Sequence, residues 1–345
     1  MQVVATTQQP STTDSYYVND GQGDFTVVND VDPAADVCSS TTDQARMSGK
    51  NIGDLLNAGN VAWGNFMGGF NLSTTNSNGT TGCNRSTHSS VTASTSADYI
   101  PHHNGFQYFA STANPKHARP NSTAAIGYTV QPGSTTPDPA NHQYDIDDFF
   151  GAVSAGNLPS VSFLKASAYQ DGHAGYSNPL DEQAFVTKVV NFLQQQPAWA
   201  NTAVIVSWDD SGGWYDHAFA TPTSSSFDSV ADQLNGPGVC GSGTQPQGVN
   251  GTPVNGRCGP GPRIPFLVIS PWAKRNFIDH TRISQASIVR FIEDNWLGGQ
   301  RLGGGSFDAT TGDVGNMFDF NSNADVIPLF LDPALGTAVA TPPPS

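Results

Sequence analysis

Residues 203–217 read AVIVSWDDSGGWYDH, and this stretch indicates the fold class. An apolar run that ends at Trp208 leads directly into Asp209, Asp210 and a glycine pair. A short apolar run without polar alternation is typical of a strand buried on both faces of a parallel sheet. Only 12% of the residues in the chain are charged. Two adjacent carboxylates at the end of a buried strand therefore point to a specific partner, and a cation is the first candidate.

The segments around this strand predict alternating helices and strands. Apolar residues recur at helical spacing, and Gly or Pro stands where each helical pattern stops. The expected order is a helix and a strand within 50–66, a helix within 144–156, a strand at 160–164, a helix within 179–199, strands at 202–208 and 263–270, and a helix that carries Ile288, Phe291 and Ile292. This order predicts an α/β fold with a mostly parallel sheet that is covered by helices on both faces.

Asp209 and Asp210 lie at the carboxyl end of their strand, where ligands bind in open α/β sheets. Two neighbouring carboxylates disfavour joint ionisation unless a cation neutralises them, and one divalent metal ion would do so. Carboxylates suit Ca²⁺, Mn²⁺, iron and Zn²⁺ alike, so the identity of the ion is left open. The alternative is that one aspartate caps the following turn while the other is solvated.

Four histidines lie in polar stretches that the topology can bring near the aspartates. His173 follows one predicted strand, His217 follows another, and His102 and His103 form the doublet of DYIPHHNGF. A lone histidine is more often a packing residue than a catalyst. Histidine can, however, donate to phosphoryl oxygens and protonate a leaving group near neutral pH. Together with the aspartates, these histidines predict metal-assisted hydrolysis of an anionic ester.

Composition argues against several other classes of function. The chain has 345 residues, with 29 Asp plus Glu against 14 Lys plus Arg and a net charge of −15. Such an acidic chain is a poor partner for nucleic acid or for an anionic membrane surface. No run approaches the roughly 20 apolar residues of a transmembrane segment. A carbohydrate-binding module is an alternative class that only the aromatic residues Trp63, Trp214 and Tyr215 favour.

The four cysteines contain no Cys-x-x-Cys pair, so a structural zinc site is not expected. Cys240 and Cys258 bracket a loop rich in Gly, Pro and Asn, and a disulfide between them leaves Cys38 and Cys83 as the second pair. Four free thiols in a cytoplasmic protein are the alternative. Abundant Ser, Thr, Asn and Gly suit an exported protein, yet no basic region followed by an apolar one opens the chain. We therefore expect a secreted or periplasmic protein whose signal peptide is not in this chain.

Several long stretches, in order, resemble the bacterial phosphoesterase family, which contains phospholipases C and related acid phosphatases. They include GKNIGDLLNAGNVAWGNFMGGF, DYIPHHNGFQYFASTANPKHARP, ASAYQDGHAGYSNPLDEQ, AVIVSWDDSGGWYDH and GPRIPFLVISPWAKRNF. The resemblance covers most of residues 47–297 and implies the alkaline-phosphatase-like, three-layer α/β/α fold. It also implies site roles, with metal ligands at Asp209 and Asp210 and active-site contacts to the phosphate at His102, His103 and His173. His217 is placed in the site because it lies in the same segment as the aspartates.

The front of the chain departs from the family pattern. Family members begin with a segment like ENRSFDHYFG, which supplies further metal ligands on the first strand, and later provide a serine or threonine nucleophile. Neither segment is found here, and Ser11 in QQPSTT lacks the surroundings of a nucleophile. We therefore expect residues 1–345 to form one partial phosphoesterase domain that lacks its N-terminal strand, with loop insertions at 71–97 and 240–258.

Two functions stay open at this point. The first is metal-dependent hydrolysis of phosphoester bonds, of the phospholipase C or acid phosphatase type, by a Ser or Thr nucleophile that this chain does not contain. Phospholipids and small phosphate esters are both candidate substrates. The second is a non-catalytic, truncated remnant that binds metal or phosphate only, in which case the chain alone is inactive.

Overall fold

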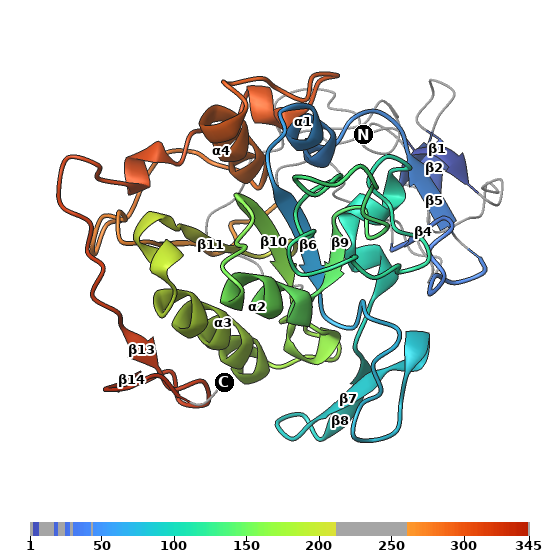
Figure 1. Ribbon diagram of the computed structural model, residues 1–345, viewed down its shortest axis with the longest axis horizontal. Helices are drawn as coiled ribbons and strands as arrows, with labels where there is room; N and C mark the ends of the chain where they lie inside the picture. The colour runs from blue at the N-terminus through green and yellow to red at the C-terminus, as the bar shows by residue number, and fades with distance from the viewer. Residues whose placement is uncertain are drawn as a thin grey trace.

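A three-stranded parallel sheet lies at the centre of the computed structural model, which describes residues 3–6, 17–19, 25–27, 30–42, 44–211 and 261–343 (Figure 1). Its strand order is β10-β6-β9, with β6 at Trp63–Met67, β9 at Gln143–Asp145 and β10 at Val161–Lys165. Both neighbours run parallel to β6. The predicted α/β class with a mostly parallel sheet is therefore confirmed, although β9 was not expected as a strand.

Helices pack against the sheet through two separate apolar clusters. Helix α2 (Ile146–Ser154) and helix α3 (Pro179–Gln194) run side by side and bury Phe149 and Val189 with Phe66 of β6. Helix α1 (Ile52–Ala58) and helix α4 (Ala286–Trp296) lie together in the second cluster. That cluster contains Trp63 of β6 and Val161 of β10, since successive side chains of a strand point to opposite faces.

Local sequence signals explain where the first helices begin. Asn51 caps α1, and its side chain accepts hydrogen bonds from the N–H groups of Gly53 and Asp54. Asp145 caps α2 in the same way, and the side chain of Asp148 completes a capping box with its backbone N–H. Such caps satisfy helix N–H groups that would otherwise have no partner. The predicted helices at these positions are therefore confirmed.

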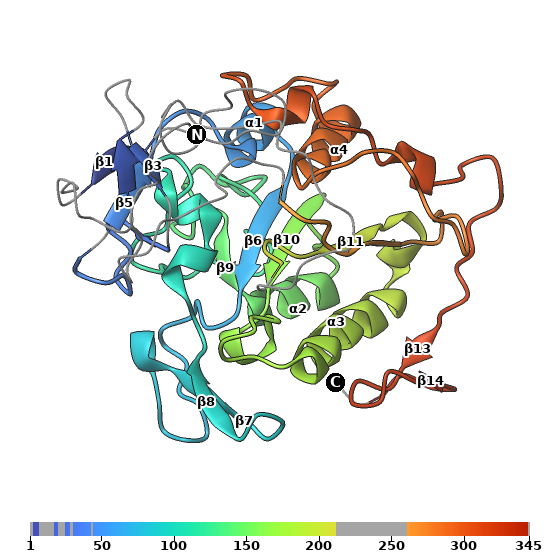
Figure 2. The ribbon, with the colours of Figure 1, turned by 180° about the vertical axis from the view of Figure 1, so that it is seen from behind.

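Smaller sheets surround this centre (Figure 2). One has the order β2-β3-β1-β5-β4, and two hairpins, β7–β8 and β13–β14, lie at the periphery. The hairpin β7–β8 corrects the prediction of a plain loop at 71–97, because alternating Ser and Thr pair there as strands. The bounds are β1 Val3–Thr6, β2 Tyr17–Asn19, β3 Phe25–Val27, β4 Asp32–Pro33, β5 Gln44–Met47, β7 Ser86–Ser89, β8 Ser94–Ala97, β13 Phe330–Leu331 and β14 Ala338–Val339.

The strand that precedes Asp209 and Asp210 does not join the parallel sheet. β11 (Val204–Ser207) pairs antiparallel with β12 (Phe266–Ile269), and within the described residues it shares no ladder with β10. A cavity of about 940 Å³ is lined by residues of both β10 and β11. The prediction that β11 and β12 belong to one parallel sheet with β10 is therefore wrong for the described residues, because β11 and β12 pair antiparallel in a sheet of their own.

One predicted disulfide is confirmed. Cys38 and Cys83 are bonded, with their Cα atoms 5.2 Å apart. The other predicted pair, Cys240 with Cys258, lies outside the described residues, so it stays a prediction. Among the helices of the described residues, none is long and apolar enough to cross a bilayer.

Candidate active site

Three segments that are distant in sequence bring the candidate residues together. A short 3-10 helix at Pro101–His103 carries the histidine doublet. The loop after β10 carries Asp171, His173 and Tyr176, and the end of β11 carries Asp209 and Asp210. The Nζ atom of Lys165, the last residue of β10, lies 3.1 Å from Oδ2 of Asp209. The carboxyl ends of β10 and β11 therefore meet, even though the strands do not pair.

His103 lies deepest among the described candidate histidines. Its side chain is 11% exposed, its Nδ1 atom lies 3.3 Å from Oδ2 of Asp171, and its Nε2 atom lies 3.4 Å from the hydroxyl of Tyr176. The ring centroids of His103 and His173 are 6.3 Å apart. The structure thus brings these two histidines to one place, with Asp171 and Tyr176 between them.

His102 faces a different element. Its Nδ1 atom lies 3.1 Å from Oδ1 of Asp32 on β4, and its side chain is 29% exposed. Its ring stands almost perpendicular to that of His103, with the centroids 4.8 Å apart. The histidine doublet therefore contributes one ring to the Asp171 side and one ring to the β4 side of the site.

The predicted metal pair lies at the surface. Asp209 and Asp210 are both exposed, and the side chain of Asp209 is 72% accessible. Partial burial works to raise the pKa of Asp209, but the ammonium of Lys165 outweighs it and holds that pKa below its ordinary value. His103 acts in the same direction on Asp209, which places the histidine within electrostatic reach of the carboxylate.

The turn that carries His173 depends on Gly172. Its backbone has φ +82°, a conformation that side chains with a Cβ rarely adopt, and a Cβ there would stand 2.8 Å from the carboxyl carbon of Glu182. The glycine of the DGHAGYS motif therefore lets Asp171 and His173 leave the same turn in different directions.

Sequence reasoning missed Lys165, Asp171 and Tyr176 as site residues. Asp171 and Tyr176 stand in the DGHAGYS stretch that carries His173, and Lys165 ends a strand that was predicted correctly. A search for every polar residue near a strand's carboxyl end would have found Lys165 and Asp171. His217 and Ser11 lie outside the described residues, so their roles stay predictions.

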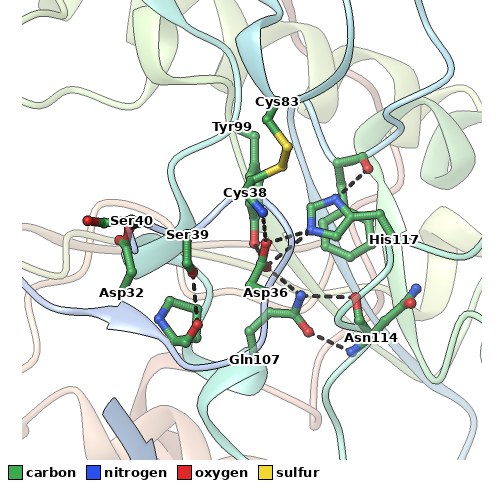
Figure 3. Close-up of a disulfide and its surroundings, with 12 residues drawn as sticks. Asp32, Asp36, Cys38, Ser39, Ser40, Cys83, Tyr99, Gln107, Asn114 and His117 are labelled. Carbon is green, nitrogen blue, oxygen red and sulfur yellow. Dashed lines mark hydrogen bonds and ion pairs between the residues drawn. A yellow bond between two sulfur atoms is a disulfide. The ribbon is translucent and has the colours of Figure 1, made fainter. Parts of the chain in front are cut away.

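A second polar cluster lies near the disulfide (Figure 3). Ligand atoms of Asp36, Cys38 and His117 lie within 4.8 Å of one another, which is close enough for one metal ion. The sulfur of Cys38 is bonded to Cys83, however, so it is no thiolate ligand in this state. Sequence reasoning did not predict this cluster, because nothing in the spacing of the three residues links them.

Hydrogen bonds already occupy this second cluster. Nε2 of His117 lies 3.1 Å from both carboxylate oxygens of Asp36, and Nδ1 of His117 lies 2.9 Å from the carbonyl oxygen of Phe70. Asp36 also accepts from Tyr99 and Gln107 (Figure 3). The pKa of Asp36 is lowered because these bonds, with that to His117 first, outweigh the opposing effect of burial. The arrangement is that of a buried polar network that fixes the fold around Cys38.

With this geometry in view, comparison with known families decides the classification. The model of the phosphoesterase family matches residues 3–297. The chain belongs to the phosphoesterase family. The match begins upstream of residue 47, so it extends the resemblance seen in the sequence toward the N-terminus.

Curated relatives of this phosphoesterase are phospholipases C. The chain is 29% identical over 202 residues to a non-hemolytic phospholipase C of Pseudomonas aeruginosa, a match that covers 54% of this chain and 27% of the relative. It is 31% identical over 152 residues to phospholipase C A of Mycobacterium tuberculosis, covering 41% of this chain and 26% of the relative. The match therefore spans about a quarter of the length of these relatives.

Proposed function

We propose that this chain carries part of the active site of a metal-dependent phosphoester hydrolase of the phospholipase C or acid phosphatase type. The observation that carries the proposal is that His103 lies near Asp171 and His173 of the loop after β10, while Lys165 at the end of β10 pairs with Asp209. Membership of the phosphoesterase family supports the reaction class. Phosphoester substrates, lipid or soluble, are the class that the relatives' name of phospholipase C favours.

Asp209 and Asp210 are the proposed metal ligands. Their adjacent carboxylates are exposed at the site, and oxygen donors of this kind fit a hard divalent cation. A metal ion held there would polarise a phosphoryl oxygen. The residues of this chain would orient the phosphate and supply protons through the histidines.

A serine or threonine is the proposed attacking group, as the resemblance to the family implies. Attack by a hydroxyl followed by hydrolysis splits one difficult step into two easier ones. The proposal keeps His102 and His173 on the phosphate side of the site, where an imidazole can donate a hydrogen bond or a proton. His217 keeps its proposed place beside Asp209 and Asp210.

A further strand between β10 and β11 is the proposed completion of the fold. The cavity of about 940 Å³ between these strands supports it. With this further strand, the sheet would gain the three-layer, alkaline-phosphatase-like architecture.

The non-catalytic alternative has one observation in its favour. Lys165 already neutralises Asp209, so the carboxylate has a partner without any metal ion. In that reading the site binds phosphate through its histidines and turns nothing over. Export of the protein is proposed as well, supported by the disulfide between Cys38 and Cys83, since such bonds persist in oxidising compartments.

The test combines metal binding with turnover. The chain and its Asp209→Asn and Asp210→Asn variants are titrated with Mn²⁺ and with Ca²⁺ by calorimetry, and hydrolysis of p-nitrophenyl phosphate and of phosphatidylcholine is assayed with each metal. Loss of a carboxylate that binds the metal directly should lower metal affinity by on the order of 10-fold or more. Asp181→Asn is the matched control, because that carboxylate bonds Ser89 instead of the site. Equal metal binding by all four proteins contradicts the metal site, and metal-dependent turnover that Asp209→Asn and Asp210→Asn abolish excludes the non-catalytic alternative.

A further inference from the structure

Both ring nitrogens of His103 already have neighbours inside the protein. Nε2 lies 3.4 Å from the hydroxyl oxygen of Tyr176, and Nδ1 lies 3.3 Å from Oδ2 of Asp171. The imidazole is 11% exposed. A histidine that donates a hydrogen bond to a phosphate needs a ring nitrogen that faces the substrate and has no protein neighbour. Both ring nitrogens of His103 have such neighbours.

Tyr176 and Asp171 fix which atom donates in this group. The Tyr176 hydroxyl donates to Oδ2 of Asp171 at 3.2 Å. Burial, followed by the charge of Asp171, raises the pKa of Tyr176, so the hydroxyl keeps its proton. A hydroxyl has one hydrogen to give, so with that hydrogen on Asp171 a bond between Tyr176 and His103 requires Nε2–H of His103 to donate to the hydroxyl oxygen. The side chain of Asp171 is fully buried, and its other oxygen accepts the backbone N–H of His173 at 3.0 Å.

His173 has the opposite character. It is exposed, and its ring lies parallel to that of Tyr176 with the centroids 4.3 Å apart. The backbone N–H of Gly175 donates to its Nδ1 atom at 3.0 Å. In the neutral ring the hydrogen is therefore on Nε2, since the bond at one nitrogen sets the proton at the other. This Nε2–H group of His173 can donate a hydrogen bond to a phosphoryl oxygen.

We propose that His103 is a positioning residue, which acts through Tyr176 and Asp171 to hold His173 as the substrate-facing donor of the site. The role of His173 rests on the proposed phosphoester function, whereas the link from His103 to Tyr176 does not. The proposal divides the work among the histidines, because His103 then touches no phosphate. The charged and titratable groups around His103 are His102, Asp171, His173, Tyr176 and Asp209.

Tyr176→Phe separates the link from the stacking. It keeps an aromatic ring against His173 but removes the acceptor at Nε2 of His103. Asp171 then offers the remaining acceptor, at Nδ1, so the hydrogen of His103 should move from Nε2 to Nδ1. Tyr169→Phe is the matched control. The hydroxyl of Tyr169 lies near Asp98 and Asp181, so its loss removes no hydrogen-bond acceptor from His103. Asp171→Ala is a second variant with the same expected outcome, since it frees the Tyr176 hydroxyl to donate to Nε2.

The experiment reads the histidine rings of the ¹⁵N-labelled chain by NMR while inorganic phosphate is added. We expect phosphate to shift the ring signals of His173 and to leave those of His103 nearly unchanged. In Tyr176→Phe the tautomer of His103 changes, and phosphate affinity falls by on the order of 10-fold, the usual cost of losing an outer positioning group. In Tyr169→Phe neither changes.

The outcomes separate the positioning role of His103 from the phosphate-binding role of His173. Direct shifts of the His103 ring on phosphate binding, or an unchanged His103 tautomer in both Tyr176→Phe and Asp171→Ala, overturn the positioning role. A changed tautomer without any phosphate effect on His173 overturns the role of His173 and counts against the proposed function, while the link from His103 to Tyr176 and Asp171 stands.

Discussion

Lys165 and Asp209 form an ion pair of 3.1 Å across two strands that share no hydrogen-bond ladder. Lys165 ends β10, and Asp209 follows β11. This ion pair links the carboxyl ends of the two strands through side chains. Its carboxylate, that of Asp209, is one that we propose as a metal ligand. Lysine and metal therefore compete for the same charge.

This competition predicts the effect of Lys165→Met. Without the ammonium, the pKa of Asp209 should rise toward its ordinary value, and the affinity of the site for Mn²⁺ near neutral pH should increase severalfold. Lys188→Met is the control, because Lys188 lies over the ring of Phe150, away from the site. Calorimetric titration compares the three proteins. Weaker Mn²⁺ binding by Lys165→Met would show that Lys165 assists the site instead of competing with a metal.

A buried carboxyl pair predicts how stability depends on pH. Glu293 of α4 and Asp308 are both fully buried. Burial, together with the facing carboxylate of Asp308, raises the pKa of Glu293 to about 7, from 4.5. A raised pKa means that the folded state holds the proton more tightly than the unfolded chain. The stabilisation is complete below about pH 4.5 and is lost as the pH rises through 7, a change of about 3 kcal/mol.

Glu293→Gln should remove this pH dependence, because the amide stays neutral at every pH. Urea unfolding from pH 5 to pH 8 measures it, with Asp294→Asn as the control at a more exposed neighbour. We expect the variant to lose less of its free energy of unfolding than the parent over this range. Parallel curves for the variant and the parent would contradict the assignment of the proton to Glu293.

The disulfide between Cys38 and Cys83 should contribute strongly to stability. The two residues are 45 positions apart, and closing a loop of that size restricts the unfolded chain by about 4 kcal/mol in the entropy model. The Cys38→Ser, Cys83→Ser double variant should unfold at clearly lower urea concentration than the parent. Added reductant should lower the stability of the parent to that of the variant and leave the variant itself unchanged.

Cys240 and Cys258 are predicted to form a second bond. Closing the loop between them restricts the unfolded chain by about 3 kcal/mol in the same model. Mass spectrometry of unreduced peptides should recover the two cysteines in one linked species. Recovery of both as alkylated thiols would show that the loop is open.

The sequence predicted the parts of the fold that local chemistry decides. Helices α1, α2 and α3 lie where the helical spacing of apolar residues and the Gly or Pro after each pattern indicated. In the structure, Asn51, Asp145 and Asn178 supply local partners for the helix N–H groups. The pairing of β11 was predicted wrongly. Its partner depends on what fills the space beside it, and a run of apolar residues carries no information on which strand that is.

The candidate site shows the same division. His103, His173 and Asp209 were named from motifs, and the structure places the rings of His103 and His173 6.3 Å apart. The order of burial among them was not predictable, because DYIPHHNGF does not say which of two adjacent histidines faces inward. Likewise, the sequence could not show that the hydroxyl of Tyr176 donates its hydrogen to Asp171, since that bond depends on the turn at Gly172.

The gap between β10 and β11 leads to the last prediction. Ser162 on β10 and Ser207 on β11 line the cavity, and among the described residues neither buried hydroxyl oxygen has a hydrogen-bond partner. A buried hydroxyl that lacks a partner costs about 1–3 kcal/mol. Ser162→Ala and Ser207→Ala should therefore leave the free energy of unfolding unchanged or raise it. Ser89→Ala is the matched control, because Ser89 donates to Asp181 and its loss should cost about 1 kcal/mol.

If a further strand fills the gap in a longer form of the protein, the two hydroxyls gain partners and the order reverses, so that the same alanine variants become destabilising there. Amide hydrogen exchange should then slow along β10 and β11 in the longer form only. Destabilisation by Ser162→Ala and Ser207→Ala in the 345-residue chain, equal to that of Ser89→Ala, would show that both hydroxyls are already satisfied and that the gap is closed.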